Sequence, residues 1–310
     1  MRFVNLHHHS TFSFGDGFGT PAQHVQRAME LGYSAITLTE HGLGSVSSHW
    51  QLEKEATKAG IKPIFGCEIY CGAVDPEHRG QFKNHLTVLA KDQDGYRNLS
   101  RIVTQSYLDY YYHPTVSGAS LAANKAGLCV LSGCSGSFLA CRLLGGKGTP
   151  EHNDTPDYEA AGEVIGRFMA WFGEAYYLEV QPFYEIERTC AMNPAYEKLG
   201  KEYGIRLVVT HDVHYPAMDD AEMQAVLHAV HRGKHSVDDV MREWNYDVPL
   251  CLPDSDRALA DRLIRTGMSK RAAHDAIATS ARIAEECNVT LPKASRLKYP
   301  ASDKDLEPWI

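Results

Sequence analysis

The chain begins Phe3-Val4-Asn5-Leu6-His7-His8-His9-Ser10, an apolar run that leads directly into three histidines. The pattern predicts a β-strand over residues 2–9. Because side chains alternate between the two faces of a strand, His7 and His9 are expected to point the same way. Two imidazoles on one face at the end of a strand form half of a metal site. His8 faces away from its two neighbours, so we expect a structural role for it. A tag remnant would be longer and would lack a strand leading into it.

The composition is that of an ordinary globular protein. The 310 residues are 44% hydrophobic and 23% charged, which suits one large α/β domain or two small ones. No apolar run approaches the length of a membrane span, and no signal-peptide pattern precedes the first strand. The eight cysteines include no CxxC pair, so we expect free thiols and a reducing, cytoplasmic location.

Strand and helix patterns alternate along most of the chain. Strands are predicted over residues 2–9, 35–39, 63–71, 85–90, 127–131, 175–180 and 206–211. Helices are expected to start at Thr20-Pro21, to cover residues 156–172 and to start at Asn193-Pro194. About seven such alternations predict a barrel-like α/β fold.

The last third of the chain has a different pattern. Residues 219–232, 256–267 and 269–287 are predicted to be helices without matching strands. Residues 291–310 contain three prolines and show no periodicity, which is typical of a linker. We therefore expect one domain over residues 1–290, with extra C-terminal helices, and a linker-like tail over 291–310.

Nine side chains of the types that bind metal ions lie on or just after predicted strands. They are His7, His9, Asp16, His41, Glu68, His85, Cys134, Asp212 and His214. Zinc takes about four ligands, so nine ligands indicate two or three ions, with Glu68 as the candidate bridge. Adjacent divalent ions suit phosphoester hydrolysis, because they activate water and stabilise the leaving oxygen. The small residues over 132–137 precede a helix, where free N–H groups could also meet a phosphate.

Charge does not exclude such a role. The formal net charge of −8 argues against a broad basic surface for nucleic acid. Three divalent ions held by Asp16, Glu68, Asp212 and a Cys134 thiolate would nevertheless leave a locally positive site that attracts phosphate.

Each residue has a plainer alternative when it is taken alone. A single histidine is usually structural, and Cys134 alone would be a small buried hydrophobe. Four tyrosines could stack on unpaired bases or simply pack: Tyr107, Tyr110, Tyr111 and Tyr112. Arg142 and Lys147 could guide a phosphate backbone or belong to a solvated loop. The remaining histidines are expected at the surface: His24, His49, His78, His152, His228, His231, His235 and His274.

Several ordered strings resemble one family. LHHHSTFSFGDG (6–17), TLTEHG (37–42), GCEIY (66–70), VLSGCSGS (130–137) and VVTHDVHY (208–215) are similar to motifs of the polymerase-and-histidinol-phosphatase (PHP) domain. With YLEVQPFY (177–184), DAEMQAVLHAVHRGK (220–234) and ARIAEECNVTLP (281–292), the resemblance is closest to the N-terminal PHP domain of bacterial DNA polymerase III α subunits.

The resemblance implies a distorted seven-stranded barrel that holds three metal ions, zinc or manganese, with iron also compatible with the donor set. It assigns the first ion to His7, His9, Glu68 and Asp212, and these four are the expected catalytic residues. It assigns the second ion to Glu68, His85 and Cys134, and the third to Asp16, His41 and His214.

The implied activity is a 3′→5′ exonuclease of the proofreading type. Its substrate would be a DNA 3′ end, and its expected partner a DNA polymerase. Two rivals remain: a small-molecule phosphatase of the histidinol-phosphate type, and a non-catalytic module that organises a polymerase. The sequence departs from the family pattern at His113 and Thr115, where basic residues are usual, and at His211, where asparagine is usual. Nothing resembles a polymerase palm, so an excised domain and a free-standing relative both stay open.

Overall fold

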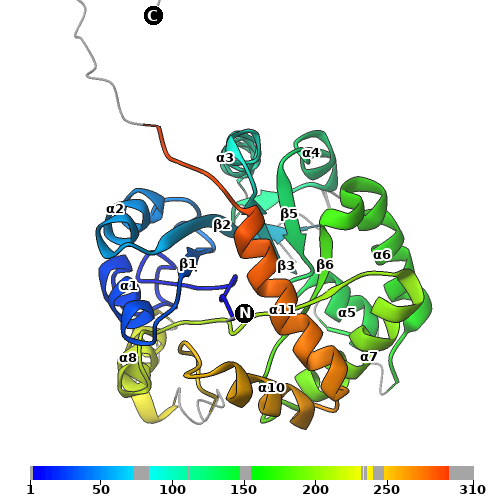
Figure 1. The fold of residues 1–310 in the computed structure, drawn as a ribbon. Helices are drawn as coiled ribbons and strands as arrows, with labels where there is room; N and C mark the ends of the chain where they lie inside the picture. The colour runs from blue at the N-terminus through cyan, green and yellow to red at the C-terminus, as the bar shows by residue number, and fades with distance from the viewer. Residues whose placement is uncertain are drawn as a thin grey trace, which may run out of the picture.

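The computed structural model describes residues 3–72, 84–110, 112–146, 155–231, 233, 236–239 and 248–292. Within these ranges one mixed sheet curls into a barrel that is surrounded by helices (Figure 1). The expected linker therefore lies, except for its first two residues, outside the described residues. The same holds for His78, His152, His235, Tyr111 and Lys147. No helix in the described ranges is long and apolar enough to cross a membrane.

The sheet runs in the order β1-β2-β3-β5-β6-β7, and β4 pairs with β2. Its strands are β1 (Ala35–Leu38), β2 (Lys62–Cys71), β3 (Asn84–Ala90), β4 (Thr115–Val116), β5 (Leu128–Leu131), β6 (Tyr176–Val180) and β7 (Leu207–Val209). All pairings are parallel except those of β3, which runs antiparallel to β2 and β5. The start of β3, with His85, thus lies at the edge where the other strands end.

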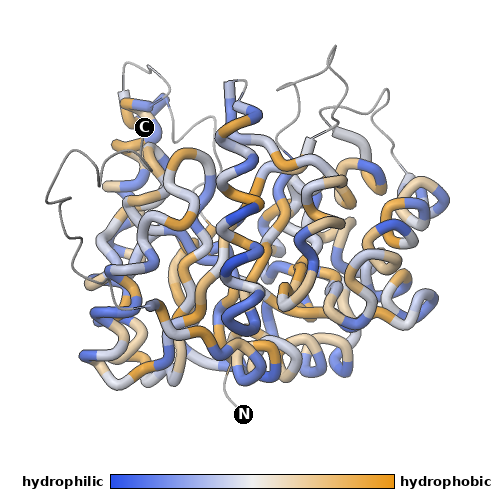
Figure 2. Tube along the Cα trace, turned by 90° about the horizontal axis from the view of Figure 1, so that it is seen from above, coloured by the Kyte–Doolittle hydropathy of each residue, from blue (hydrophilic) through white to orange (hydrophobic). Residues whose placement is uncertain are grey.

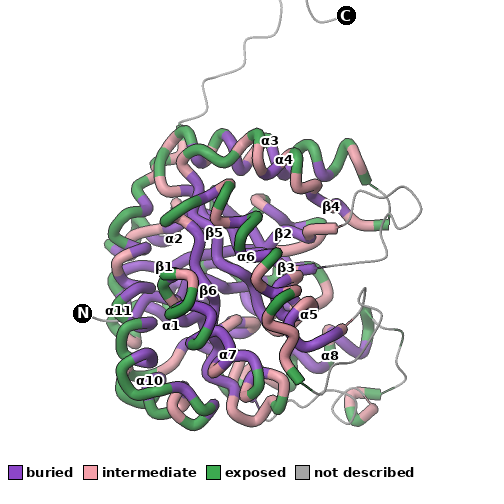
Figure 3. The backbone as a smooth tube through the Cα atoms, turned by 90° about the vertical axis from the view of Figure 1, so that its right-hand side faces the viewer, coloured by how far each residue is buried: buried purple, intermediate pink, exposed green. Residues whose placement is uncertain are grey.

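Helices cover the outside of the strands. They are α1 (Pro21–Glu30), α2 (His49–Ala59), α3 (Gln93–Leu108), α4 (Gly118–Ala123), α5 (Phe138–Leu144), α6 (Tyr158–Phe172), α7 (Glu187–Tyr203), α8 (Ala221–His231), α10 (Asp256–Arg265) and α11 (Lys270–Glu286). Thr20 caps α1 in a capping box with Gln23, as the Thr-Pro start predicts. Hydrophobic and hydrophilic residues alternate along these helices (Figure 2), and their outer faces are exposed while the strands are buried (Figure 3).

The predicted first strand is not a regular strand. Within residues 3–9 the one ladder contact is a parallel bridge between His8 and Val213. The His9 N–H donates to the Val213 carbonyl at 2.7 Å, and the Thr39 N–H donates to the His8 carbonyl at 2.8 Å. The segment therefore lies between the chain after β1 and the chain after β7. The His7 carbonyl accepts a hydrogen bond from the Val213 N–H at 3.2 Å and a second one from the Asn5 side-chain amide at 2.7 Å.

Two other predicted boundaries were wrong. The last strand ends at Val209 rather than at residue 211, because Asp212 adopts a positive φ of 45° that turns the chain. Helix α7 begins at Glu187, and Pro194 lies inside it. The φ of proline is compatible with a helix, although its ring removes one backbone hydrogen bond. Burial of the next two residues, Ala195 and Tyr196, favours the helix at this point. The short elements β4 and α4 were not predicted.

One end of the barrel is filled by apolar side chains. Residues of the N-terminal segment, of the strands and of the end of α11 with Cys287 after it form one buried cluster: Val4, Leu6, Ala35, Ile64, Leu89, Cys129, Leu131, Tyr177, Val208, Ile283, Ala284 and Cys287. Helix α11 crosses this end (Figure 1). The Lys62 ammonium group at the start of β2 donates to the Ala284 carbonyl near the end of α11 at 2.8 Å. Packing therefore closes this end, and the candidate ligands lie toward the other.

Candidate metal centre

All nine predicted ligands meet at one end of the barrel. They form four overlapping groups, and within each group the ligand atoms lie within 4.8 Å of one another. The first group is His7-His9-Glu68, the second Glu68-His85-Cys134 and the third Asp16-His41-His214. The fourth, His9-Asp212-His214, overlaps the first, and Asp212 is counted with the first group because its Oδ1 atom also lies close to His7. The assignment of these residues as metal ligands remains a prediction. The geometry adds which of them are close enough to share an ion.

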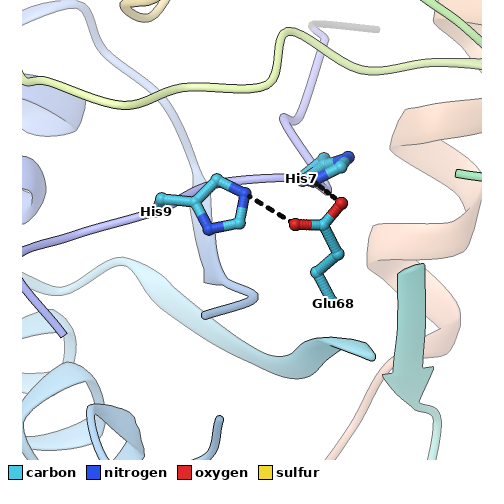
Figure 4. Close-up of side chains that lie close together, drawn as sticks. All are labelled: His7, His9 and Glu68. Carbon is cyan, nitrogen blue, oxygen red and sulfur yellow. Dashed lines mark ion pairs between the residues drawn. The ribbon is translucent and has the colours of Figure 1, made fainter. Parts of the chain in front are cut away.

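The first group surrounds a point between two imidazoles and two carboxylates. The His7 Nε2 atom lies 3.3 Å from Glu68 Oε1 and 3.4 Å from Asp212 Oδ1. The His9 Nε2 atom lies 3.4 Å from Glu68 Oε2 and 3.5 Å from Asp212 Oδ1. Figure 4 shows both rings turned toward the Glu68 carboxylate. His7 Nε2, His9 Nε2 and Asp212 Oδ1 are all buried without a hydrogen-bond partner. Buried polar atoms are rarely left unpaired, so this arrangement fits a cation between them.

Glu68 connects the first group to the second. Its Oε1 atom faces His7 and also lies 2.7 Å from His85 Nδ1. The Cys134 Sγ atom is 3.4 Å from the same His85 nitrogen and 4.0 Å from Glu68 Oε1. Cys134 follows Gly133, whose φ of 85° forms the turn after β5. Glu68 thus lies between His7 and His85, and its role as a bridging carboxylate stays a prediction.

The third group is centred on Asp16. Its Oδ2 atom lies 2.6 Å from His41 Nε2 and 3.3 Å from His214 Nε2. Asp16 comes from the loop before α1, His41 from the chain after β1, and His214 from the chain after β7. Three separate segments therefore converge on one carboxylate.

The sequence analysis missed Glu179, which holds His7. Glu179 is fully buried on β6, and its Oε1 atom accepts a hydrogen bond from His7 Nδ1 at 2.7 Å. The hydroxyls of Thr87 and Thr210 donate to the same carboxylate at 3.0 and 2.6 Å. With its proton on Nδ1, the His7 ring presents an Nε2 lone pair to the first group. A glutamate inside the apolar strand Tyr176–Val180 was the signal that could have found it.

A second missed carboxylate, Glu40, supports His9. The His9 Nδ1 atom lies 2.9 Å from Ser13 Oγ, and the Ser13 hydroxyl donates to Glu40 Oε2 at 2.6 Å. The His214 Nδ1 atom likewise donates to the Asp212 carbonyl at 2.8 Å. Each of these rings therefore turns Nε2 toward the cluster. Such outer hydrogen bonds are typical of histidines that bind metal ions.

The electrostatics of the cluster also favour a cation. Burial would raise the pKa values of Glu68 and Asp212, but neighbouring histidines hold both well below their usual range. Burial would lower the pKa of His7, but Asp212, Glu179 and Glu68 hold it well above its ordinary value. Burial lowers the pKa of His9 to about 3, so this ring is neutral and can act as a ligand. Each ion pair described for the Glu68, Asp212 and Asp16 carboxylates involves a histidine.

The surroundings of Cys134 also favour a nearby cation. Burial raises the pKa of its thiol well above the usual value, and the nearby carboxylates of Glu68 and Asp212 raise it further. The thiolate form therefore requires a compensating cation at this position.

Three histidines that were predicted to be at the surface are buried instead. His24 Nδ1 lies 2.8 Å from His8 Nε2, which agrees with the structural role expected for His8. His49 Nε2 donates to the Gly66 carbonyl at 2.8 Å. His228 contacts the Asp16 carboxylate. These three residues lie on helices. The sequence alone does not distinguish a histidine on the buried face of a helix from one on its solvent-exposed face.

The residues considered for substrate contact lie at or near the surface. Tyr107 is 38% exposed, and its hydroxyl donates to the Leu43 carbonyl at 2.8 Å, close to His41 in the chain. Tyr110 and Tyr112 are exposed. Arg142 lies 4.0 Å from Glu163. Tyr107 therefore packs on the loop after His41, and the Tyr110 and Tyr112 side chains are accessible to an unpaired base.

Sequence comparison places this site in a known family. The PHP domain family matches residues 5–182, a stretch that contains seven of the nine candidate ligands. The DNA polymerase III subunit alpha of Treponema pallidum is 33% identical over 309 residues, which cover 96% of this chain and 24% of that protein. The corresponding subunit of Thermus aquaticus is 28% identical, with the same coverage. The chain thus spans about a quarter of the length of these relatives.

The similar solved structures include two with low sequence identity and low TM-scores. An amidohydrolase from Chromobacterium violaceum is 14% identical, with a TM-score of 0.43, over 69% of this chain and 88% of that one. A two-domain protein from Bacteroides vulgatus, containing a predicted PHP-like metal-dependent phosphoesterase, is 18% identical, with a TM-score of 0.40, over 76% and 56%. These likenesses are too distant to inform on activity. The family match covers more than half of the sequence, and the chain belongs to the PHP domain family.

Proposed function

We propose that this chain is a metal-dependent phosphoesterase that removes nucleotides from the 3′ end of DNA. The observation that carries the proposal is the convergence of three buried, unpartnered ligand atoms: His7 Nε2, His9 Nε2 and Asp212 Oδ1. Membership of the PHP domain family supports a metal-dependent phosphoesterase, and the relatives named DNA polymerase III subunit alpha support a DNA substrate and a polymerase as partner.

The donor set would hold three ions. His7, His9, Glu68 and Asp212 would hold the first, Glu68, His85 and Cys134 the second, and Asp16, His41 and His214 the third. Imidazole and thiolate suit zinc or iron, and the carboxylates suit manganese. Bound divalent ions would supply the Lewis acidity that activates water and stabilises the leaving oxygen of a phosphodiester.

The protein residues contribute orientation. Glu179 and Ser13 fix the proton of His7 and of His9 on Nδ1, so both rings are already in the tautomer that a ligand needs. The buried ligands His7 and Glu68 are 0% and 2% exposed, whereas Asp16 and His85 are 28% and 29% exposed. A phosphodiester would therefore approach from the side of Asp16 and His85.

The test is digestion of a 5′-labelled single-stranded oligonucleotide, with a mismatched primer–template alongside. Wild-type protein, His9→Ala and His274→Ala are purified in the same way and assayed with zinc, manganese or chelator. His274 is an exposed histidine on α11, so its variant controls for a general effect of replacing a histidine. Loss of cleavage in His9→Ala alone excludes a contaminating nuclease. We expect a ladder that shortens from the 3′ end with wild type and the control, and that chelator and His9→Ala abolish.

Other outcomes point to the two rivals. Faster turnover of histidinol phosphate or a nucleoside monophosphate than of the oligonucleotide would replace the proposal by a small-molecule phosphatase. Fully metallated protein that hydrolyses neither substrate would indicate a non-catalytic module. Equal cleavage by His9→Ala and wild type would remove His9 from the site.

A further inference from the structure

We propose that helix α8 is a positioning element of the third metal group, and that His228 orients the Asp16 carboxylate for the ion. The inference rests on the proposed metal centre and adds to it a residue that lies outside the nine predicted ligands. His228 is a positioning residue in this proposal, because it acts through Asp16.

The two oxygens of Asp16 have separate partners. His41 and His214 face Oδ2 at 2.6 and 3.3 Å, and His228 Nε2 contacts Oδ1. A carboxylate only accepts hydrogen bonds, so His228 Nε2 is the donor. Oδ1 is thereby held by the protein, and Oδ2 is left toward the two candidate ligands. This is the division expected of a ligating carboxylate whose outer oxygen is fixed by a hydrogen bond.

The same face of α8 holds the backbone beside Asp16. Gln224 lies one turn before His228, and its amide donates to the Asp16 carbonyl at 3.1 Å. His231, seven residues after Gln224, packs so close to Gly15 that a Cβ there would lie 2.6 Å from its ring. Residues at positions i, i+4 and i+7 share one face of a helix. Three side chains of α8 therefore clamp residues 15 and 16.

Two of these three side chains are buried, which separates them from an ordinary surface contact, whereas His231 at the end of the helix is exposed. Gln224 and His228 are 0% and 5% exposed, although the neighbouring Phe14 in the same loop is 73% exposed. Because a buried donor already restricts the Asp16 side chain, ion binding costs less side-chain conformational entropy than it would for an aspartate that is free in an exposed loop.

The geometry favours positioning over direct ligation. The atoms of Asp16, His41 and His214 that could hold an ion lie within 4.8 Å of one another, and His228 is outside that group. Its nitrogen instead faces the oxygen of Asp16 that is turned away from His41 and His214.

The experiment measures metal binding by the full chain. Metal-free wild type, His228→Ala, His228→Gln and the control His274→Ala are titrated with zinc and, separately, with manganese, and bound metal is counted after dialysis. We expect His228→Ala to bind one of the three ions about 10–100-fold less tightly, with the affinity for the other two unchanged. The glutamine amide nitrogen can replace imidazole Nε2 as a donor, so His228→Gln should recover most of the affinity.

Thermal unfolding of the metal-free proteins separates this role from a structural one. If His228 only supported the fold, His228→Ala would melt earlier without metal, and glutamine would not rescue binding of one ion selectively. Equal binding of all ions by His228→Ala and wild type would overturn the proposal, as would a glutamine variant as weak as alanine. A wild type that binds fewer than three ions would remove the third group and this inference with it. Three bound ions without DNA cleavage would refute the proposed activity alone.

Discussion

The two ends of the barrel are built by the same strands but have opposite chemistry. On β6, Tyr177 belongs to the buried apolar cluster, and Glu179, two residues later, holds His7. On β3, Leu89 is in the apolar cluster, and Thr87, on the same face, donates to Glu179. Side chains two positions apart on a strand lie on the same face. On each of these strands, a move of two residues along the chain therefore leads from the apolar interior to the polar layer next to the candidate ligands.

This difference separates stability from chemistry. Burial of apolar surface at the α11 end stabilises the fold. Grouped buried carboxylates and imidazoles at the other end cost free energy unless they are paired or bind cations. A fold closed firmly at one end can tolerate that cost at the other. Substitutions at the apolar end should therefore change unfolding, and those at the polar end should change metal binding and activity.

The largest effect is expected for Asp212→Asn at the polar end. The variant removes one carboxylate of the first group while the amide keeps its shape. We expect hydrolysis to fall by on the order of 10³-fold, or about 4 kcal/mol, together with the loss of bound metal. Chemical unfolding of the metal-free variant should stay close to that of wild type. Full activity with this substitution would contradict the assignment of Asp212.

Leu89→Ala makes the opposite test at the apolar end. Leu89 is fully buried and faces the interior from β3. Removal of its side chain leaves a cavity, so we expect the free energy of unfolding to fall by about 3 kcal/mol. Urea unfolding measures that loss, and metal counting at low temperature should give the wild-type number of ions. A change in metal content with little loss of stability would break the proposed division between the ends.

Glu179→Gln lies between the two ends and sharpens the boundary. The amide can no longer accept hydrogen bonds at both oxygens from His7, Thr87 and Thr210. Its effect should appear in metal affinity, about 10–100-fold weaker, or about 1.4–2.7 kcal/mol. Competition with a chromophoric chelator measures this affinity. If affinity were unchanged and only stability fell, Glu179 would belong functionally with the apolar end.

The sequence predicted the gathering of the ligands because strand ends meet at one edge. Strand alternation was sufficient for His7 and His9, and the apolar runs located Glu68 and His85. Alternation could not predict the positive φ of Asp212, since that turn depends on how the chain after β7 meets residues 7–9. A seven-stranded barrel was predicted and the sheet has seven strands, but the short β4 is one of them in place of residues 2–9, which make only one bridge.

The missed residues share a physical reason. Glu179 lies within a strand rather than at its end, and His228 lies on a helix after the last strand. Both act through another side chain, His7 or Asp16, so no local spacing indicates their partners. Contacts between residues 172 or 212 positions apart arise from the fold, and the local pattern of apolar and polar residues does not predict them.

The smallest predicted effect concerns Lys62, which ties β2 to the helix that closes the apolar end. Its ammonium group donates to the carbonyls of Ala284 and Glu285 at 2.8 and 3.2 Å and to Asn288 Oδ1 at 2.9 Å. A cation at a helix C-terminus contributes about 0.3–1 kcal/mol, so Lys62→Met should lower the free energy of unfolding by about that amount. The loss should shrink at high salt, which screens a partly exposed charge. Urea unfolding at two salt concentrations measures both effects, and bound metal should be unchanged, because Lys62 lies at the end of the barrel away from the candidate ligands.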